Sequence, residues 1–281
     1  MSDAFVDIDG MTIATRSFGG SGRSLLLVHG GADTLESWNE IGAALTKTFR
    51  VVAFDMRGHG CSSVPTTLTM DDLLSEIKGV GNALRLKEPI LVGHGFGAGN
   101  CLRYASMADA DCAGVIAIDP GPWRTGEQLP PWGLELVAAQ EYGWEGTRDD
   151  LEAALAKCLE CAPDGASPTV VEANFRRARQ ESSVGRFIRK PPIPYVQRMG
   201  ELPRMQENQL GDELFAAISR PVRLVCGTTG LLGQARGFAE SLPAVYPNVT
   251  VTFLDAGRYV HWQRNKEVTQ EIVRFAQDIA S

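Results

Sequence analysis

A glycine occupies the place in this chain where a catalytic oxygen is expected. Residues 90–99 predict a buried strand, a sharp turn and the start of a helix. This is the frame of the nucleophile elbow, G-x-S-x-G, in which the central serine sits on a strained turn with its oxygen exposed above the sheet. Gly95 stands at the position of that serine. Because glycine has no group that can attack a carbonyl, an acyl-enzyme at position 95 is excluded.

The composition argues against binding to nucleic acid or to membranes. The 281 residues, 44% of them hydrophobic, suffice for one α/β domain with room for an insertion. Lys and Arg number 27 against 34 Asp and Glu, and no basic cluster is present to attract a polyanion. The sequence shows neither a signal-like start nor an apolar run of about 20 residues, so we expect a soluble, cytoplasmic protein.

The six cysteines are expected to be free thiols, because they are scattered through a large chain that can build its own core. Cys158 and Cys161 form a C-x-x-C inside a helical pattern, with no second Cys or His pair nearby. We therefore interpret them as buried small hydrophobic residues rather than as a zinc or redox site.

Short apolar runs alternate with helical patterns, which predicts a mainly parallel sheet with helices on both faces. An antiparallel hairpin turned by Asp9-Gly10 is expected over residues 4–16. The expected parallel strands are residues 24–28, 51–54, 90–92, 114–118, 222–226 and 249–254. The expected helices include residues 38–45, 70–84, 100–107, 151–161 and 266–279.

The stretch from about Trp123 to Ile218 breaks this alternation. It contains no convincing strand, only helical periodicity, proline-rich joints and more charge. A helical insertion between two strands of such a sheet is placed as a lid over the strand ends, where ligands bind. We therefore predict a first core segment at residues 1–122, a helical cap at 123–218 and a second core segment at 219–281.

Four motifs, in the expected order, resemble those of α/β-hydrolase-fold proteins with a helical cap. His29-Gly30-Gly31 is similar to the family's oxyanion loop, and residues 55–62 (DMRGHGCS) resemble its D-x-R-G-H-G-x-S turn. The elbow frame comes next, and the loop GRYVHW resembles the one that carries the catalytic histidine, here His261. The resemblance covers almost the whole chain outside the cap, and it implies the α/β-hydrolase fold.

Two members of the family's catalytic triad are missing. Besides Gly95, Gly230 stands at the last position of G-x-x-D, where the family commonly places its acid. Two losses favour a natural departure over a single inactivating substitution. His261 still needs a partner to hold its ring, and some relatives carry the acid at the end of the strand that here leads to Asp119. Asp119 is the candidate partner, although an Asp-Pro pair can also simply open a turn.

The backbone oxyanion hole can outlast the nucleophile. Its donors in the family map to the N–H groups of Phe96 and of Gly31 or Ala32. Such donors stabilise developing negative charge by roughly 3 kcal/mol each. The side chain missing from position 95 also leaves space for substrate or water.

Aromatic residues of the loops and cap indicate an apolar ligand of aromatic or polyketide-like character. Those expected to line the pocket are Trp38, Trp123, Tyr259 and Trp262, with Trp132, Tyr142 and Trp144 nearby. His29, His59 and His94 lie in motifs where serine-dependent relatives also carry histidine, so we interpret them as structural. No acidic cluster accompanies them at ligand spacing, so we expect neither a metal nor a cofactor.

These residues favour an enzyme that handles an oxyanion or enolate without a covalent intermediate. His261 would remove a proton from carbon, hydroxyl or water, while the backbone donors hold the charge. The residues are compatible with several reactions on a small carbonyl-bearing metabolite, as in secondary metabolism: elimination, aldol-type cleavage, cyclisation, cofactor-free oxygenation and hydrolysis. The sequence is also compatible with a homodimer. Two alternatives remain: a small-molecule-binding pseudoenzyme, and a hydrolase whose nucleophile has moved to Cys61, with Ser62 structural.

Overall fold

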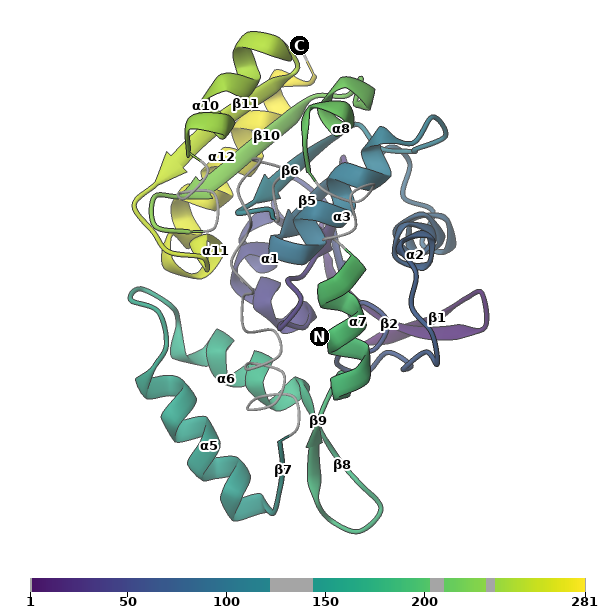
Figure 1. Cartoon of the computed structure of the whole chain (residues 1–281), viewed down its shortest axis with the longest axis vertical. Helices are drawn as coiled ribbons and strands as arrows, with labels where there is room; N and C mark the ends of the chain where they lie inside the picture. Colours follow the sequence, from purple (N-terminus) through teal and green to yellow (C-terminus); the bar gives the residue numbers. More distant parts are fainter. Residues whose placement is uncertain (1, 122–143, 203–209, 231–235, 281) are drawn as a thin grey trace.

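One eight-stranded sheet runs through the protein, in the order β1-β2-β4-β3-β5-β6-β10-β11 (Figure 1). The structure is a computed structural model that describes residues 2–121, 144–202, 210–230 and 236–280. The strands are β1 (Ala4–Ile8), β2 (Met11–Gly19), β3 (Ser24–Val28), β4 (Arg50–Phe54), β5 (Ile90–His94), β6 (Gly114–Ile118), β10 (Val222–Gly227) and β11 (Val249–Leu254). β1 and β2 form the predicted antiparallel hairpin, and all pairs from β4 to β11 are parallel. The α/β-hydrolase fold is confirmed.

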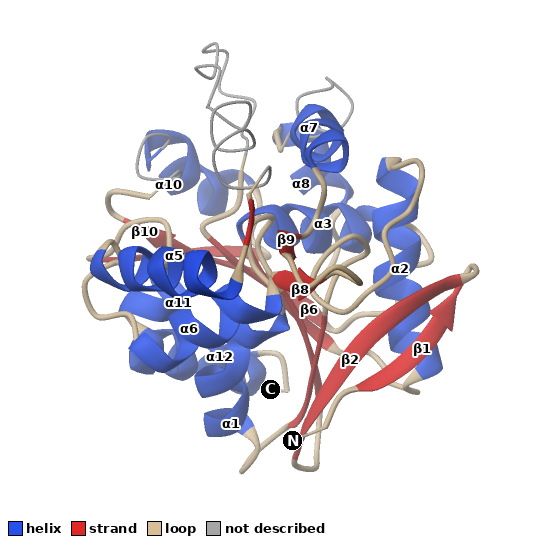
Figure 2. Ribbon diagram, turned by 90° about the horizontal axis from the view of Figure 1, so that it is seen from below, coloured by secondary structure: helices blue, strands red, loops and turns tan. Residues whose placement is uncertain are grey.

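Helices cover both faces of this sheet (Figure 2). One face carries α1 (Asn39–Leu45), α11 (Val260–Gln263) and α12 (Asn265–Asp278), and the other carries α2 (Met70–Ala83), α3 (Gly95–Ser106), α8 (Asp212–Ala217) and α10 (Arg236–Val245). No described helix is both long and apolar enough to cross a bilayer.

The alternation of side chains along β3 explains why both faces must be covered. Leu25 and Leu27 belong to the hydrophobic core under α1 and α12, whereas Leu26 and Val28 belong to the core under α2 and α3. All four side chains are fully buried. A strand that is apolar on both faces is stable only between two helical layers.

The insertion is not purely helical, so that prediction was wrong. It contains a three-stranded sheet of β7 (Glu145–Gly146), β8 (Arg179–Glu181) and β9 (Phe187–Arg189) beside α5 (Arg148–Glu160), α6 (Pro168–Arg177) and α7 (Ile193–Glu201). The strands have two or three residues and carry charged side chains. Strands so short and polar leave no alternation of apolar residues in the sequence.

Helix α6 ties the insertion to the core. It packs against the short 3-10 helix η1 (Leu35–Trp38) that follows β3. Arg177 of α6 binds the fully buried carboxylate of Asp55 at 2.7 Å and that of Asp3 at 2.6 Å. At its other end, the insertion merges with the core earlier than residue 218, because Phe215 and Ile218 are buried in the main hydrophobic core.

Candidate functional site

The carboxyl ends of the parallel strands bring five loops to one edge of the sheet, where ligands bind in open α/β folds. Asp33 follows β3, Gly95 follows β5, and Asp119 follows β6. Gly230 follows β10 and His261 follows β11. The site is therefore assembled from loops that are far apart in the sequence.

Gly95 keeps the backbone of a nucleophile elbow. Its φ is +51°, in the left-handed region that suits glycine and that a serine would occupy with strain. Among the described residues, a Cβ atom built on Gly95 would meet only Nη2 of Arg258, at 3.8 Å. The turn thus retains the geometry of the motif and leaves open the space of the missing side chain.

His261 is fully buried, yet neither ring nitrogen has a hydrogen-bond partner among the residues that the structure describes. Its ring packs instead between Trp38, with ring centroids 5.0 Å apart, and His94, at 4.1 Å. Burial and the charge of His94 lower the pKa of His261 well below its usual value, against an opposing effect of Asp33. A neutral ring with an available lone pair can accept a proton or bind a cation.

Asp119 occupies the place left by the family's usual acid. A Cβ atom on Gly230 would lie 2.8 Å from Cγ of Asp119, so the Asp119 carboxylate fills the volume of a side chain at 230. Asp119 is fully buried and strained, with φ +42°. The expected hydrogen bond to His261 is nevertheless absent, and the His261 ring lies against the ring of His94 at an interplanar angle of 40°.

A carboxylate missed in the sequence lies beside His94. Oδ2 of Asp33 is 3.2 Å from Nδ1 of His94, and both side chains are 2% exposed. With His261, these residues place one ligand atom each within 4.8 Å of one another. The spacing of acidic residues around the histidines in the sequence did not reveal this carboxylate, because Asp33 lies 61 residues from His94. The signal was an Asp directly after a Gly-rich turn at a parallel strand end.

A side chain of α6, in the insertion, is hydrogen-bonded to Asp33. Nδ2 of Asn174 in α6 donates to Oδ1 of Asp33 at 3.4 Å, and Oδ1 of Asn174 accepts from both N and Oγ1 of Thr34 at 2.8 Å. Burial raises the pKa of Asp33, but the hydrogen bond from His94 and the charges of His94, His261 and His29 outweigh it and lower the pKa. The lowered pKa keeps Asp33 ionised at neutral pH, although its side chain is buried.

The expected oxyanion donors come from two neighbouring segments. A Cβ atom on Gly31 would lie 3.4 Å from Cβ of Phe96, so the loop after β3 adjoins the first turn of α3. That turn has no side-chain cap. Ala32 follows in the same loop, and its carbonyl oxygen accepts from Arg189 of the cap. The geometry of the donors toward an oxyanion stays a prediction.

Three of the four aromatic residues expected at the site are described, and they surround His261. Beyond Trp38, Trp262 lies 5.6 Å and Tyr259 lies 6.3 Å from the His261 ring, between centroids. Tyr259 and Trp262 stack on each other at 4.6 Å. Trp123, Trp132 and Tyr142 lie outside the described residues.

The alternative nucleophiles have no activated geometry. Burial raises the pKa of the Cys61 thiol, which opposes formation of a thiolate. Oγ of Ser62 donates to the carbonyl of Asp55 and accepts from N of Ala14, which confirms a structural role. Cys158 and Cys161 are free thiols, as are the other four cysteines, but they are half-buried and exposed, so the prediction of burial was wrong.

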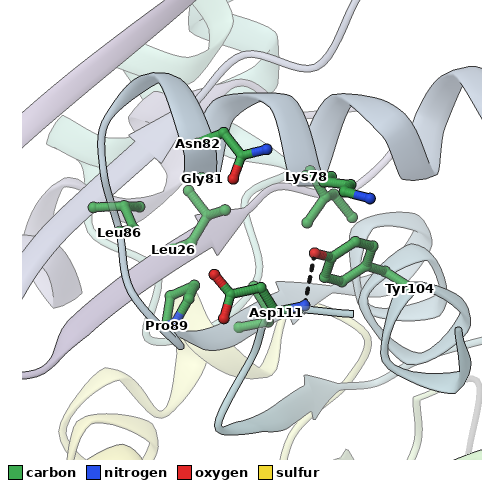
Figure 3. A pocket seen from close by; sticks show the side chains of 10 residues that line it. Leu26, Lys78, Gly81, Asn82, Leu86, Pro89, Tyr104 and Asp111 are labelled. Atoms are coloured by element: carbon green, nitrogen blue, oxygen red, sulfur yellow. Dashed lines mark hydrogen bonds between the residues drawn. The ribbon is translucent and has the colours of Figure 1, made fainter. Parts of the chain in front are cut away.

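A small hollow between α2 and α3 is too small to be a substrate site (Figure 3). Its volume is about 10 Å³, the space of a single water molecule. Its lining includes Pro89, which directly precedes β5, and Asp111, which lies shortly before the start of β6. The hollow therefore lies at the edge of the sheet opposite the strand ends that carry His261.

Comparison with known proteins gives the same fold and a group of hydrolases. Residues 23–264 match the family model for the alpha/beta hydrolase fold. The 2-(acetamidomethylene)succinate hydrolase of Mesorhizobium japonicum is 34% identical over 95% of this chain and 90% of its own length. The N-formylmaleamate deformylase of Pseudomonas putida is 24% identical over 87% and 85%.

Solved structures agree. That of E-2-(acetamidomethylene)succinate hydrolase has a TM-score of 0.80 at 23% identity and covers 98% of this chain and 99% of that one. The thioesterase domain from the curacin biosynthetic pathway has a TM-score of 0.78 at 21% identity, with 97% and 99% covered. The motifs, the sheet order and the match over most of the sequence give one conclusion: the chain belongs to the α/β-hydrolase fold family.

Proposed function

We propose that this protein hydrolyses an amide bond of a small carboxylated metabolite with an activated water molecule and no acyl-enzyme. Among the reactions compatible with its residues, hydrolysis is favoured because the two relatives described above are named hydrolase and deformylase. The compounds in their names, an acetamidomethylene succinate and a formylmaleamate, each carry both an N-acyl group and a carboxylate. A substrate of this kind replaces the apolar ligand expected from the aromatic residues.

The observation that carries the proposal is the open elbow at Gly95. Its φ of +51° keeps the turn, and the nearest atom to an added Cβ is Nη2 of Arg258 at 3.8 Å. Water or the substrate carbonyl has room where the serine oxygen would be. The nearby guanidinium supplies a positive charge that suits a substrate carboxylate.

In the proposed reaction, His261 takes a proton from water as the water oxygen attacks the carbonyl carbon. The N–H groups of Phe96 and of Gly31 or Ala32 hold the negative charge of the tetrahedral intermediate. The carbon–nitrogen bond then breaks, and the nitrogen receives the proton from His261. Asp119, in the volume of the family's usual acid, is proposed to orient the His261 ring once it turns away from His94.

The test is hydrolysis of E-2-(acetamidomethylene)succinate and N-formylmaleamate in ¹⁸O-labelled water, followed by acid quenching and intact-protein mass spectrometry. We expect release of acetate or formate that carries one ¹⁸O, with no mass added to the protein. An acylated protein would overturn the mechanism without a nucleophile. No turnover of either compound would overturn the proposed substrate class.

Two substitutions at the elbow give a matched pair for this test. Gly95→Ser restores an oxygen next to the oxyanion donors, so a serine-directed phosphonate should label it, at least slowly. Gly95→Ala has the same backbone strain without the oxygen and should stay unlabelled, like the unmodified protein. Both variants should lose hydrolysis, since each fills the proposed position of the water. Labelling of the Ala variant would point to a nucleophile elsewhere.

One observation favours a second candidate, a protein that binds a small molecule without turning it over. His261 has no hydrogen bond to any described residue, and a base that nothing orients is a poor catalyst. Tight binding of either compound, with no product released by the full chain, would support this candidate.

A further inference from the structure

We propose that Asp33, His94 and His261 form a binding site for a divalent transition-metal ion such as zinc. Three side chains from three segments converge: Asp33 after β3, His94 at the end of β5 and His261 in α11, after β11. Their ligand atoms all lie within 4.8 Å of one another, and all three residues are buried. Two imidazoles and one carboxylate are a donor set that zinc and iron accept.

The contacts of His94 favour a cation next to Asp33. Nε2 of His94 lies 3.0 Å from the carbonyl oxygen of Arg258, which can only accept, and Nδ1 lies 3.2 Å from Oδ2 of Asp33. A neutral imidazole carries one hydrogen and can donate to one of these acceptors only, so in either tautomer one lone pair faces an oxygen. When Nε2 donates to Arg258, the lone pair of Nδ1 faces the carboxylate, and a second proton or a metal ion between them removes the repulsion.

His261 decides between these two cations. A second proton on His94 would satisfy its contact with Asp33, but it would leave both nitrogens of His261 buried without a partner among the residues described. A buried polar atom without a hydrogen bond costs about 1–3 kcal/mol. A metal ion shared by the three residues satisfies both needs together, because it takes the lone pairs of His94 and His261 and the charge of Asp33.

The distances fit a metal site before the ion enters. Two ligands of a tetrahedral zinc ion lie about 3.3 Å apart, close to the 3.2 Å between Asp33 and His94. The three ligand atoms lie up to 4.8 Å apart, so the His261 ring must approach the other two by up to about 1.5 Å to complete the site. No hydrogen bond from the described residues holds its ring nitrogens against that movement.

The surroundings of the ligands have the features of a metal site. Metal-bound histidines usually donate their second ring N–H to a carbonyl or carboxylate, and bound carboxylates are hydrogen-bonded in turn. Here Nε2 of His94 lies within hydrogen-bond distance of the carbonyl oxygen of Arg258, and Nδ2 of Asn174 donates to Oδ1 of Asp33. A Cβ atom on Gly30 would lie 2.6 Å from both Oδ2 of Asp33 and Nδ1 of His94, so a glycine there keeps this space open.

Metal binding and the proposed hydrolysis would exclude each other. An ion bound to His261 takes the lone pair that the base needs, so the occupied site is a blocked state of the enzyme. The site itself does not depend on the proposed function, because its occupancy can be measured without any substrate.

The test is titration of the full chain with Co²⁺ after removal of metals with a chelator, followed by calorimetry and visible absorption. We expect one ion per chain and the intense absorption of four-coordinate cobalt. Asp33→Asn and His94→Gln should each weaken binding at least tenfold. A double variant, Cys158→Ser with Cys161→Ser, removes the C-x-x-C thiols and should bind as the unmodified chain does.

Circular dichroism shows which variants are folded. If His94→Gln does not fold, Asp33→Asn decides the outcome, because the amide of asparagine has the same shape as the carboxylate of aspartate. Loss of binding in Asp33→Asn with retention in the double cysteine variant supports the site. No cobalt binding by the full chain, unchanged binding by Asp33→Asn, or loss in the cysteine variant would overturn it.

Discussion

His29 and His261 are both fully buried, but their surroundings differ in every polar contact. At the start of the loop after β3, Nδ1 of His29 donates to the carbonyl of Gly30 at 2.7 Å, and its Nε2 accepts from N of Met56 at 2.9 Å. In α11, after β11, neither nitrogen of His261 has a partner in the part of the chain that the structure describes. A satisfied buried histidine holds loops together, whereas an unsatisfied one is available for a substrate, a proton or a metal ion.

Of the substitutions that test this difference, replacement of His261 should have the largest effect, and that effect should be on turnover. His261→Leu removes the only ring nitrogens proposed to accept a proton, and the rate of hydrolysis should fall by about a thousandfold. Steady-state kinetics on the hydrolysed amide would measure the loss. A rate within tenfold of the unmodified protein would show that His261 is not the base.

The same substitution at the satisfied histidine should act on stability. His29→Leu removes two hydrogen bonds and leaves N of Met56 buried without an acceptor, so the free energy of unfolding should fall by about 2–4 kcal/mol. In metal-free buffer, His261→Leu should not lower it and should raise it by about 1–3 kcal/mol, because an apolar side chain replaces two buried ring nitrogens that have no partner among the described residues. Urea denaturation of both variants compares them directly, and equal losses would contradict the contrast.

A smaller effect is expected where Asp119 fills the volume of a side chain at 230. The methyl group of Gly230→Ala would lie 2.8 Å from Cγ of Asp119, so the carboxylate must move, and the variant should lose about 1–3 kcal/mol of stability together with part of its activity. Gly237→Ala is the matched control, because a Cβ atom there has no neighbour within 4 Å and the position lies in helix α10. If both variants behave alike, Asp119 does not depend on the space at 230.

The smallest expected effect concerns the ion pairs of Asp3 with Arg16 and Arg177. Burial raises the pKa of Asp3, but the hydrogen bonds and charges of Arg177 and Arg16 outweigh it, so the pKa falls below its usual 3.8. The stability from this carboxylate is therefore present above pH 3.8 and is lost as the pH falls through the lowered pKa. Asp3→Asn should cost less than about 1 kcal/mol at neutral pH. Urea denaturation across acidic pH should show this difference vanish, and a constant difference would exclude the ionised carboxylate as its source.

The core of the fold was predictable because its signals are local and periodic. Ser24–Val28, Gly114–Ile118 and Val249–Leu254 are strands at the predicted bounds, since apolar runs between turns leave a clear pattern. The small sheet of the cap was not predictable, because β8 and β9 have three residues each and are rich in charge. Length and alternation, the two features that identify a strand in a sequence, were both absent.

The site was predictable only where motifs fix it. The elbow at Gly95 and the loop of His261 follow from sequence patterns, but Asp33 meets His94 from 61 residues away and Asn174 reaches Asp33 from the cap. Such contacts depend on the order of the strands and on how the insertion folds back. The contact of the His261 ring with His94 joins residues of two different segments, and a motif carries no information about such a contact.

The hydrogen bonds of Asn174 join the position of α6 to that of a buried charge. The same amide binds the backbone and side chain of Thr34 in the core and donates to the carboxylate of Asp33. A displacement of α6 from Thr34 would have to break these bonds, and it would remove one of the hydrogen bonds that hold the Asp33 carboxylate. One amide side chain therefore serves both the contact between the insertion and the core and the orientation of the anion beside His94.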